Sequence, residues 1–383
     1  MRHITIIGPA YPYRGGIAHF SSSLSNAFKK RGIETTLVTF SLQYPGVFFP
    51  GTSQFDEGPP PQDLKIFRWL HSINPISWFR TAKRIRKLDP DLVIVQYWMP
   101  FLAPCLGTVC RLIRNRSGIK VISIVHNVTP HEGGLMDRQL SKYFFRSCDG
   151  FITLSSSVLD DLARYHPGAP VRTVPHPMYS FFGEKLDRGS ACSHLGLDPQ
   201  KKYLLFFGLI RPYKGLDLIL KALDHPHIRS MNICLLVAGE FYEKKEIYQK
   251  IIDDLEIGDK VILSDKYIPD GEVKYFFSAA DLVVQPYKSA TQSGVTQIAY
   301  QFERPTLVTH VGGLPELVSH METGYVTGLS EEDIAEAIHD FFEHKREHQF
   351  VKKIRNFKHR FQWDHVVSEL DALDQLLKAN DQE

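Results

Sequence analysis

The stretches Gly208-Leu-Ile-Arg-Pro-Tyr-Lys-Gly215 and Ser293-Gly294-Val295 decide how this chain folds and what it can bind. The first follows an apolar run typical of a buried strand, and the second opens a segment with helical spacing. Arg211 and Lys214 lie three residues apart, beyond the expected end of that strand. Two cations that face a helix start with free backbone N–H groups supply what a pyrophosphate needs without a metal ion. Together the stretches predict a pocket for the diphosphate of a nucleotide.

Short apolar, β-branched runs alternate with helical stretches along the chain, and the series occurs twice. This pattern is typical of parallel strands that are buried on both faces. The first series breaks at Val174-Pro-His-Pro177. We therefore expect an α/β fold of two Rossmann-like, doubly wound domains, whose ligand cleft faces the carboxyl ends of the strands. The expected strands are 4–7, 35–39, 92–96, 120–125, 150–153 and 171–174, then 203–207, 233–238, 261–263, 282–284 and 306–308.

The length of 383 residues suits two domains. We expect an N-terminal domain at 1–178, a linker at 179–200, a C-terminal domain at 201–360, and a helix at 361–383 that packs back toward the N-terminal domain. The first residues are too short for a signal peptide and no long apolar run exists, so we expect a cytoplasmic protein. The five scattered cysteines form no Cys-x-x-Cys pair and are expected to be buried apolar fillers.

Charge is distributed unevenly although the chain as a whole carries only +2. Residues 1–175 hold 21 Lys and Arg against 11 Asp and Glu, and Leu64–Leu88 holds seven basic residues, two tryptophans and no acid. This segment is either a helix on its own sheet with a solvated cationic face, or a contact for an anionic membrane surface or lipid-linked acceptor. Nucleic acid is not expected as a partner, because no known binding signature is present. The helical spacing runs through Ile76, Phe79, Ala82, Ile85 and Leu88.

Six motifs lie at expected strand ends and helix starts: Gly15-Gly16, Gly208…Arg211…Lys214-Gly215, Gly239-Glu240, Tyr287…Ser293-Gly294-Val295, Val311-Gly-Gly-Leu-Pro-Glu316 and the closing Trp363. Their order resembles that of the retaining, family-4 (group 1) glycosyltransferases of the GT-B fold, over nearly the whole chain. The resemblance implies a hexosyl-type transferase that moves a sugar from a nucleotide-diphosphate sugar to an acceptor hydroxyl with retention of configuration. It further implies no cofactor, no metal, and a saccharide or lipid-linked acceptor in the synthesis of cell-surface polysaccharide or glycolipid. The N-terminal domain would then bind the acceptor and the C-terminal domain the donor.

One departure from the family concerns the donor sugar. The family usually has two glutamates eight positions apart that contact the sugar and the ribose, and those places hold Ala290 and Ile298 here. Nearby, Gln292 and Thr291 are candidates for the sugar contact, and Gln297 is a candidate for the ribose. The missing pair leaves open a non-catalytic subunit that binds sugar nucleotides. A sugar-nucleotide epimerase, which shares the fold, is a second alternative.

Two glutamates and a glycine pair complete the expected donor site. Glu240 and Glu316 are candidates for contacts with the donor sugar or ribose, against the alternatives of a solvated turn residue and a helix cap. Gly15-Gly16 lets the backbone approach a ligand, and we expect the Gly16 N–H to reach the diphosphate. A plain tight turn is the alternative.

The cluster His126-Asn127-Val-Thr-Pro-His131-Glu132 follows another expected strand. A histidine at this place can bind the sugar or stabilise developing positive charge, so we expect His126 to act in catalysis with the two cations. A histidine satisfied within the core is the alternative. Asn127, His131 and Glu132 are expected on the acceptor side. The proline within the cluster excludes a helical His-x4-His face, and no metal site is expected.

Overall fold

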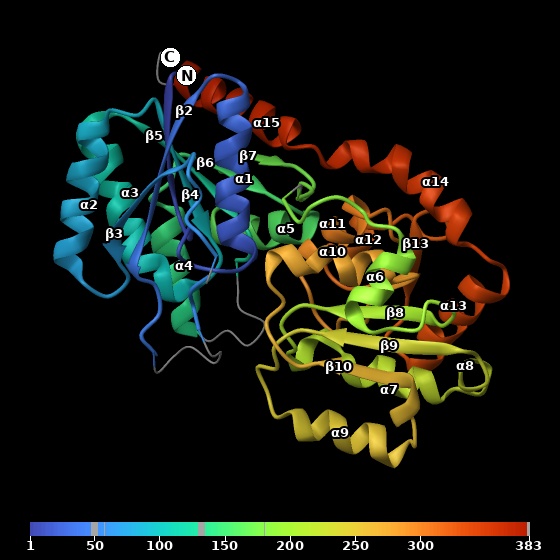
Figure 1. The fold of residues 1–383 in the computed structure, drawn as a ribbon. Coiled ribbons are helices and arrows are strands. Elements are labelled where there is room, and N and C mark those ends of the chain that lie inside the picture. The colour runs from blue at the N-terminus through green and yellow to red at the C-terminus, as the bar shows by residue number, and fades with distance from the viewer. Residues whose placement is uncertain (47–52, 57, 129–134, 180, 381–383) are drawn as a thin grey trace. The chain divides into compact units, whose positions relative to one another are not determined.

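A computed structural model describes residues 1–46, 53–56, 58–128, 135–179 and 181–380. The chain divides into two compact units, Met1–Pro175 with Gln362–Glu383, and His176–Phe361. Each unit is built on one parallel sheet with helices packed against it (Figure 1). The expected pair of Rossmann-like, doubly wound sheets is therefore confirmed.

The first unit contains a seven-stranded sheet in the order β3-β2-β1-β4-β5-β6-β7. The strand order reverses between β1 and β4, which places the ligand crevice of such a sheet beside the carboxyl ends of these two strands. The strands are β1 (His3–Ile7), β2 (Glu34–Leu42), β3 (Lys65–His71), β4 (Leu92–Tyr97), β5 (Lys120–Val125), β6 (Gly150–Thr153) and β7 (Val171–Thr173). The helices are α1 (Gly16–Lys30), α2 (Pro75–Leu88), α3 (Ala103–Ser117), α4 (Leu135–Phe145), α5 (Ser156–Tyr165) and α15 (Trp363–Ala379).

The second unit repeats this arrangement with six strands in the order β10-β9-β8-β11-β12-β13, and its switch point lies between β8 and β11. The strands are β8 (Lys202–Phe207), β9 (Ile233–Ala238), β10 (Val261–Ser264), β11 (Leu282–Gln285), β12 (Thr306–Thr309) and β13 (Gly324–Thr327). The helices are α6 (Arg188–Leu195), α7 (Leu216–Asp224), α8 (Pro226–Arg229), α9 (Lys245–Asp254), α10 (Asp270–Ala279), α11 (Gly294–Gln301), α12 (Leu314–Leu317), α13 (Glu331–Glu343) and α14 (Glu347–Phe357).

Helices cover both faces of the first sheet (Figure 1). The C-terminal helix α15 shares one buried core with α1, where the rings of Phe20 and Trp363 lie 4.9 Å apart. Arg31 at the end of α1 pairs with Asp364 and Asp371 of α15. Helices α2, α3, α4 and α5 share the core on the opposite face. The chain therefore returns to its first unit to complete one of the two helical layers.

The five cysteines are free and buried, which confirms their expected role as apolar fillers. None of the helices in the described ranges is both long and apolar enough to span a bilayer.

Two strands, β3 and β13, were missed by the apolar pattern. β3 forms one edge of its sheet, and Leu70 is its only buried residue, with Lys65 and Arg68 exposed. An edge strand need not be apolar on both faces, so its pattern differs from that of the central strands. β13 was missed for a different reason: it is only four residues long and begins at a glycine, so its apolar run is too short to be recognised.

The expected apolar stripe of α2 is wrong in its first half. Ala82 and Ile85 are buried, but Ile76 and Phe79 are 62% and 56% exposed. A spacing of three residues falls behind the helical period by about 60° at each step, so the stripe winds around the helix instead of following one face. The buried face passes through Thr81, Ala82 and Ile85.

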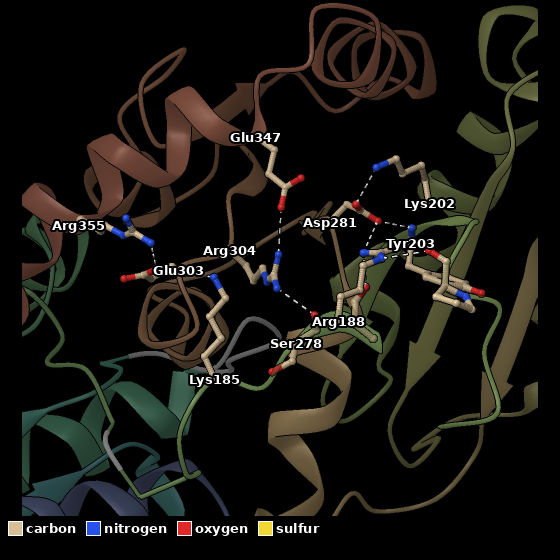
Figure 2. Close-up of polar contacts among 12 residues, drawn as sticks. Lys185, Arg188, Lys202, Tyr203, Ser278, Asp281, Glu303, Arg304, Glu347 and Arg355 are labelled. Carbon is tan, nitrogen blue, oxygen red and sulfur yellow. Dashed lines mark hydrogen bonds and ion pairs between the residues drawn. The ribbon is translucent and has the colours of Figure 1, made fainter. Parts of the chain in front are cut away.

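An ionic network holds residues 183–200 and α14 to the body of the second unit (Figure 2). Arg188 pairs with Asp281, and Arg304 bridges Glu347 on α14 and the carbonyl oxygen of Ser278. The stretch that the sequence marks as a linker thus carries α6 and belongs to the second unit.

Glu303 is the most heavily paired carboxylate of this network. Its oxygens accept from Arg355 at 2.9 Å and Lys358 at 3.2 Å, and Lys185 lies 3.6 Å away. Desolvation raises the pKa of Glu303, but the hydrogen bonds from Arg355 and Lys358 outweigh it and lower the pKa to about 2.

Replacing Glu303 with Gln should destabilise the protein at neutral pH by about 1–2 kcal/mol, after allowance for solvent screening. Because the folded pKa lies near 2 and the ordinary value is 4.5, the stabilisation is complete above about pH 4.5 and is lost as the pH falls toward 2. Thermal unfolding at several pH values measures the difference. Glu322→Gln, which breaks an exposed pair with Lys353, is the matched control and should change little. A constant difference between wild type and Glu303→Gln across this pH range would contradict the assignment.

Candidate functional site

The two decisive stretches of the sequence meet at the switch point of the second sheet. Gly208 leaves β8 with a φ of +98°, and a Cβ at this position would lie 3.0 Å from Lys214 Nζ and 3.9 Å from Val295 Cγ2. The loop after β8, the lysine and the start of α11 are therefore packed around one point. Only glycine gives the backbone the conformation and the space required there.

Lys214 is a buried cation, with only 8% of its surface exposed. Its Nζ lies 5.5 Å from the centre of the Tyr287 ring, which offers a weak cation–π contact. Desolvation, and then the charge of Arg211, lower the pKa of Lys214 to about 7. Arg211 itself is half-buried, with its guanidinium carbon 4.9 Å from the centre of the Tyr242 ring. Within the described residues neither cation has a carboxylate within ion-pair distance. The pair thus forms a concentrated positive charge that a bound anion would neutralise.

A buried polar network shapes the start of α11. Ser293 caps the helix by accepting a hydrogen bond from Val295 N, and its hydroxyl donates to Gln285 Oε1 at the end of β11. Gln285 Nε2 donates in turn to Thr296 Oγ1 at 2.9 Å. These bonds fix the helix start with its first backbone N–H groups directed along the helix axis, which favours negative charge at this end.

Neighbouring loops close around this point. The loop after β9 pairs with the loop after β8, because Ile210 N donates to the carbonyl oxygen of Glu240 at 2.9 Å. Gly312 approaches so closely that a Cβ there would lie 1.6 Å from Ala290 O. Glu240 is buried, whereas Glu316 is exposed and lines a separate cavity of about 580 Å³ with His310, His320 and Arg360. The backbone of Glu240 thus lies directly beside the loop that carries the cations.

The donor-sugar candidates differ in their exposure. Ala290 and Ile298, which stand where the family has glutamates, are both buried. Gln297 is fully buried, and within the described residues its amide has no hydrogen-bond partner. Thr291 and Gln292 are half-buried in the loop before α11, where Thr291 O accepts from Gly313 N at 3.2 Å.

In the first unit, Gly15-Gly16 and His126 lie at the carboxyl edge beside the β1–β4 switch point. Gly15 is the N-cap of α1 and has a φ of +111°, a conformation that favours glycine. His126 follows β5 and lies 6% exposed, with its Nε2 2.6 Å from Gln96 Oε1 and its ring against Phe20.

The acceptor-side candidates of this cluster are described only in part. Asn127 Oδ1 is buried and lacks a hydrogen-bond partner among the described residues. His131 and Glu132 lie outside the described residues. In the ranges that the structure describes, no group of three or more His, Cys, Asp or Glu side chains is arranged to hold a metal ion.

Sequence reasoning missed several residues that build these sites. Gln285 and Gln96 each end a strand that is otherwise apolar, and this polar ending is the signal that marks them. Tyr179 lies against the start of α11, where its ring carbon would be 3.5 Å from a Cβ on Gly294, and its hydroxyl is 3.4 Å from His176 Nε2. Burial lowers the pKa of His176 to about 4, so this histidine is neutral at physiological pH.

Family models match most of the chain. The model described as Glycosyltransferase Family 4 covers residues 14–178, and the model described as Glycosyl transferases group 1 covers residues 192–357. The chain belongs to the family-4, group 1 glycosyltransferases.

Similar proteins support this assignment. The D-inositol 3-phosphate glycosyltransferase of Segniliparus rotundus is 27% identical over 61% of this chain, and the lipopolysaccharide 1,2-N-acetylglucosaminetransferase of Salmonella typhimurium is 27% identical over 54%. The matches span 54% and 56% of those proteins, so the chain covers about half the length of these relatives.

Solved structures confirm the GT-B fold. Sucrose-phosphate synthase from Thermosynechococcus elongatus superposes with a TM-score of 0.78 at 16% identity, covering 99% of this chain and 100% of that one. Anabaena HepE, solved in complex with UDP, gives 0.72 at 14% identity, with coverage of 97% and 100%.

Removing either cation should weaken binding of a nucleotide diphosphate by about 1.5–3 kcal/mol, the range for hydrogen bonds to charged groups. Arg211→Ala deletes the half-buried guanidinium, and Lys214→Met removes the buried charge while keeping most of the volume. Calorimetric titration with UDP, ADP and GDP measures the loss. Lys221→Ala on the exposed side of α7 is the control and should bind like wild type. Unchanged affinity in both site variants would remove the cation pair from the binding site.

Binding of the diphosphate should take up a proton above neutral pH. The pKa of Lys214 is about 7 in the empty site against an ordinary 10.5, and a bound anion favours its charged form. Affinity should therefore fall by up to about tenfold for each pH unit above 7, where the ligand is already ionised. Titrations in buffers of different ionisation enthalpy count the proton. Lys214→Met should lose this pH dependence, and a wild-type affinity that is flat from pH 7 to 9 would contradict it.

Proposed function

We propose that this protein is a retaining glycosyltransferase of the hexosyl type that takes its sugar from a nucleotide-diphosphate sugar. The observation that carries the proposal is a pair of cations, Arg211 and Lys214, that have no carboxylate partner in the described part of the chain. Lys214 lies beside the start of α11 at the switch point of the second sheet, and Arg211 is close enough to lower its pKa. A diphosphate is the part of such a donor that this charge distribution recognises. The two relatives named above, a D-inositol 3-phosphate glycosyltransferase and a lipopolysaccharide 1,2-N-acetylglucosaminetransferase, support the same class of reaction.

The proposed chemistry follows from where charge develops. The bond between the anomeric carbon and the diphosphate oxygen breaks, and negative charge grows on the leaving diphosphate. Lys214, Arg211 and the backbone N–H groups at Ser293–Val295 stabilise this charge more strongly than that of the intact donor. The acceptor hydroxyl attacks from the face that the diphosphate leaves, and its proton passes to a diphosphate oxygen. A glycoside and a nucleoside diphosphate result, and no protein carboxylate acts as a nucleophile.

Buried cations and a helix start take the role that a divalent ion has in other sugar transferases, so we propose that the reaction is independent of metal. The first unit is proposed to supply the acceptor side, with His126 and Asn127 at its carboxyl edge. The acceptor is a saccharide or a lipid-linked saccharide used in cell-surface polysaccharide or glycolipid synthesis. This places the protein in the cytoplasm, as a peripheral protein of the inner membrane face.

Transferase activity should persist in the presence of a chelator. Purified protein is incubated with a panel of nucleotide sugars and saccharide acceptors in EDTA, with nucleoside diphosphate release as the readout and NMR of the anomeric proton as the test of retention. Restoration of activity only by magnesium or manganese, or an inverted product, would overturn the corresponding part of the proposal.

A control with the donor alone separates the alternatives. An epimerised sugar nucleotide would identify an epimerase. Nucleotide binding without turnover across the panel would favour a non-catalytic subunit, which the buried Ala290 and Ile298 make a specific alternative.

A further inference from the structure

Helix α2 has two differently occupied faces. Its inner face packs on the first sheet through Thr81, Ala82 and Ile85. On its outer face, Ile76, Arg80, Lys83 and Lys87 follow the spacing that lines up one side of a helix, with Phe79 beside them. All five are exposed.

The outer face is apolar at its first turn and basic after it. Ile76 and Phe79 are 62% and 56% exposed, and Ile73 in the preceding turn is 56% exposed. The cations extend over the following turns, and Leu64–Leu88 contains no acid that could neutralise them. Large exposed apolar side chains beside exposed cations suit the boundary between lipid headgroups and acyl chains, because the apolar groups can contact the acyl chains while the cations contact the headgroups.

The apolar tip lies at the functional edge of the sheet. β3 ends at His71, and α2 begins at Pro75, so the turn between them lies at the edge where β1, β4 and β5 also end. β3 is two strands away from β1, which is about 10 Å at the usual strand spacing. Helix α4 follows β5 and shares a core with α2, so its first turn lies at the same edge and on the same face of the sheet; Met136 in that turn is 76% exposed.

We propose that Ile73, Ile76 and Phe79 form a wedge that enters an anionic phospholipid surface, with Arg80, Lys83 and Lys87 contacting the headgroups. This inference rests on the proposed function and specifies its acceptor: a sugar acceptor anchored in that surface reaches the carboxyl edge of the first sheet without leaving the bilayer. The chemistry of the patch favours a lipid surface over a protein partner, because its segment contains seven cations and no acid, and its exposed apolar side chains lie together in the first turn of α2 and the turn before it.

Co-sedimentation of the full chain with vesicles tests the wedge. Wild type should pellet with vesicles of phosphatidylcholine and phosphatidylglycerol at low salt and be released by salt, and it should stay in solution with pure phosphatidylcholine. Lys83→Gln with Lys87→Gln should weaken binding about tenfold to thirtyfold, since each cation near such a surface contributes on the order of 1 kcal/mol. Ile76→Ser with Phe79→Ser should weaken it at least about tenfold through lost apolar burial.

A fluorescent label distinguishes insertion from simple adhesion. Because the five native cysteines are buried, a thiol-reactive, environment-sensitive dye can be placed selectively at Ile76→Cys. Its emission should shift to the blue with anionic vesicles only. Leu329, 48% exposed before the acidic start of α13 in the second unit, is the matched control: Leu329→Ser should bind like wild type and a dye at Leu329→Cys should not shift.

Three results would overturn the wedge: wild type that ignores anionic vesicles at low salt, an Ile76→Ser/Phe79→Ser variant that binds like wild type, or a dye at residue 76 that does not shift. Calorimetric binding of UDP, ADP or GDP to the same preparations separates the two proposals. Loss of vesicle binding with nucleotide binding intact removes only the wedge. Vesicle binding in a protein that binds no nucleotide and transfers no sugar removes only the proposed function.

Discussion

A buried lysine that has no carboxylate partner among the residues the structure describes is the constraint on which the carboxyl edge of the second unit depends. Burial of an unpaired charge is costly, and Arg211 adds repulsion to the desolvation of Lys214. The surrounding loops nevertheless enclose this side chain, down to a glycine that leaves room for its ammonium group. Such an arrangement is unfavourable for the empty protein and favourable for an anion complex, because the anion gains a cation that water no longer screens.

Both sheets carry a buried polar side chain near the carboxyl end of a strand beside the switch point. β4 and β11 occupy equivalent places in the strand order, and each carries a buried glutamine at its carboxyl end, Gln96 and Gln285. Loops cover this part of the sheet, so a polar group there needs a partner within reach. Gln96 contacts His126, and Gln285 holds Ser293 and Thr296. In each unit the side-chain amide of this glutamine thereby holds a polar side chain of a neighbouring loop or helix start: His126 in the first unit, and Ser293 and Thr296 in the second.

The sequence predicts those parts of the fold whose signal is local. Central strands were found because burial on both faces makes them apolar along their length, whereas β3 was missed because an edge strand is half exposed. The cation pair was found because three residues of spacing after a strand determine where both side chains project. Tyr179 could not be found in this way, since its contact with Gly294 joins segments more than a hundred residues apart. The buried face of α2 could not be predicted from spacing alone either, because it depends on how the helix packs on its sheet.

The backbone of the loop before α11 is held by contacts that do not depend on the two positions where the family usually has glutamates. Pro286 O is approached so closely by Gly215 that a Cβ there would lie 1.9 Å away, and Gly312 abuts Ala290 O in the same manner. The carbonyl oxygen of Tyr287 accepts a hydrogen bond from Thr309. These contacts anchor the loop at its start, its second residue and its middle, and none of them involves a side chain at position 290 or 298. The backbone geometry of this loop is thus independent of the side chains at positions 290 and 298, so those side chains can differ while the course of the loop stays the same.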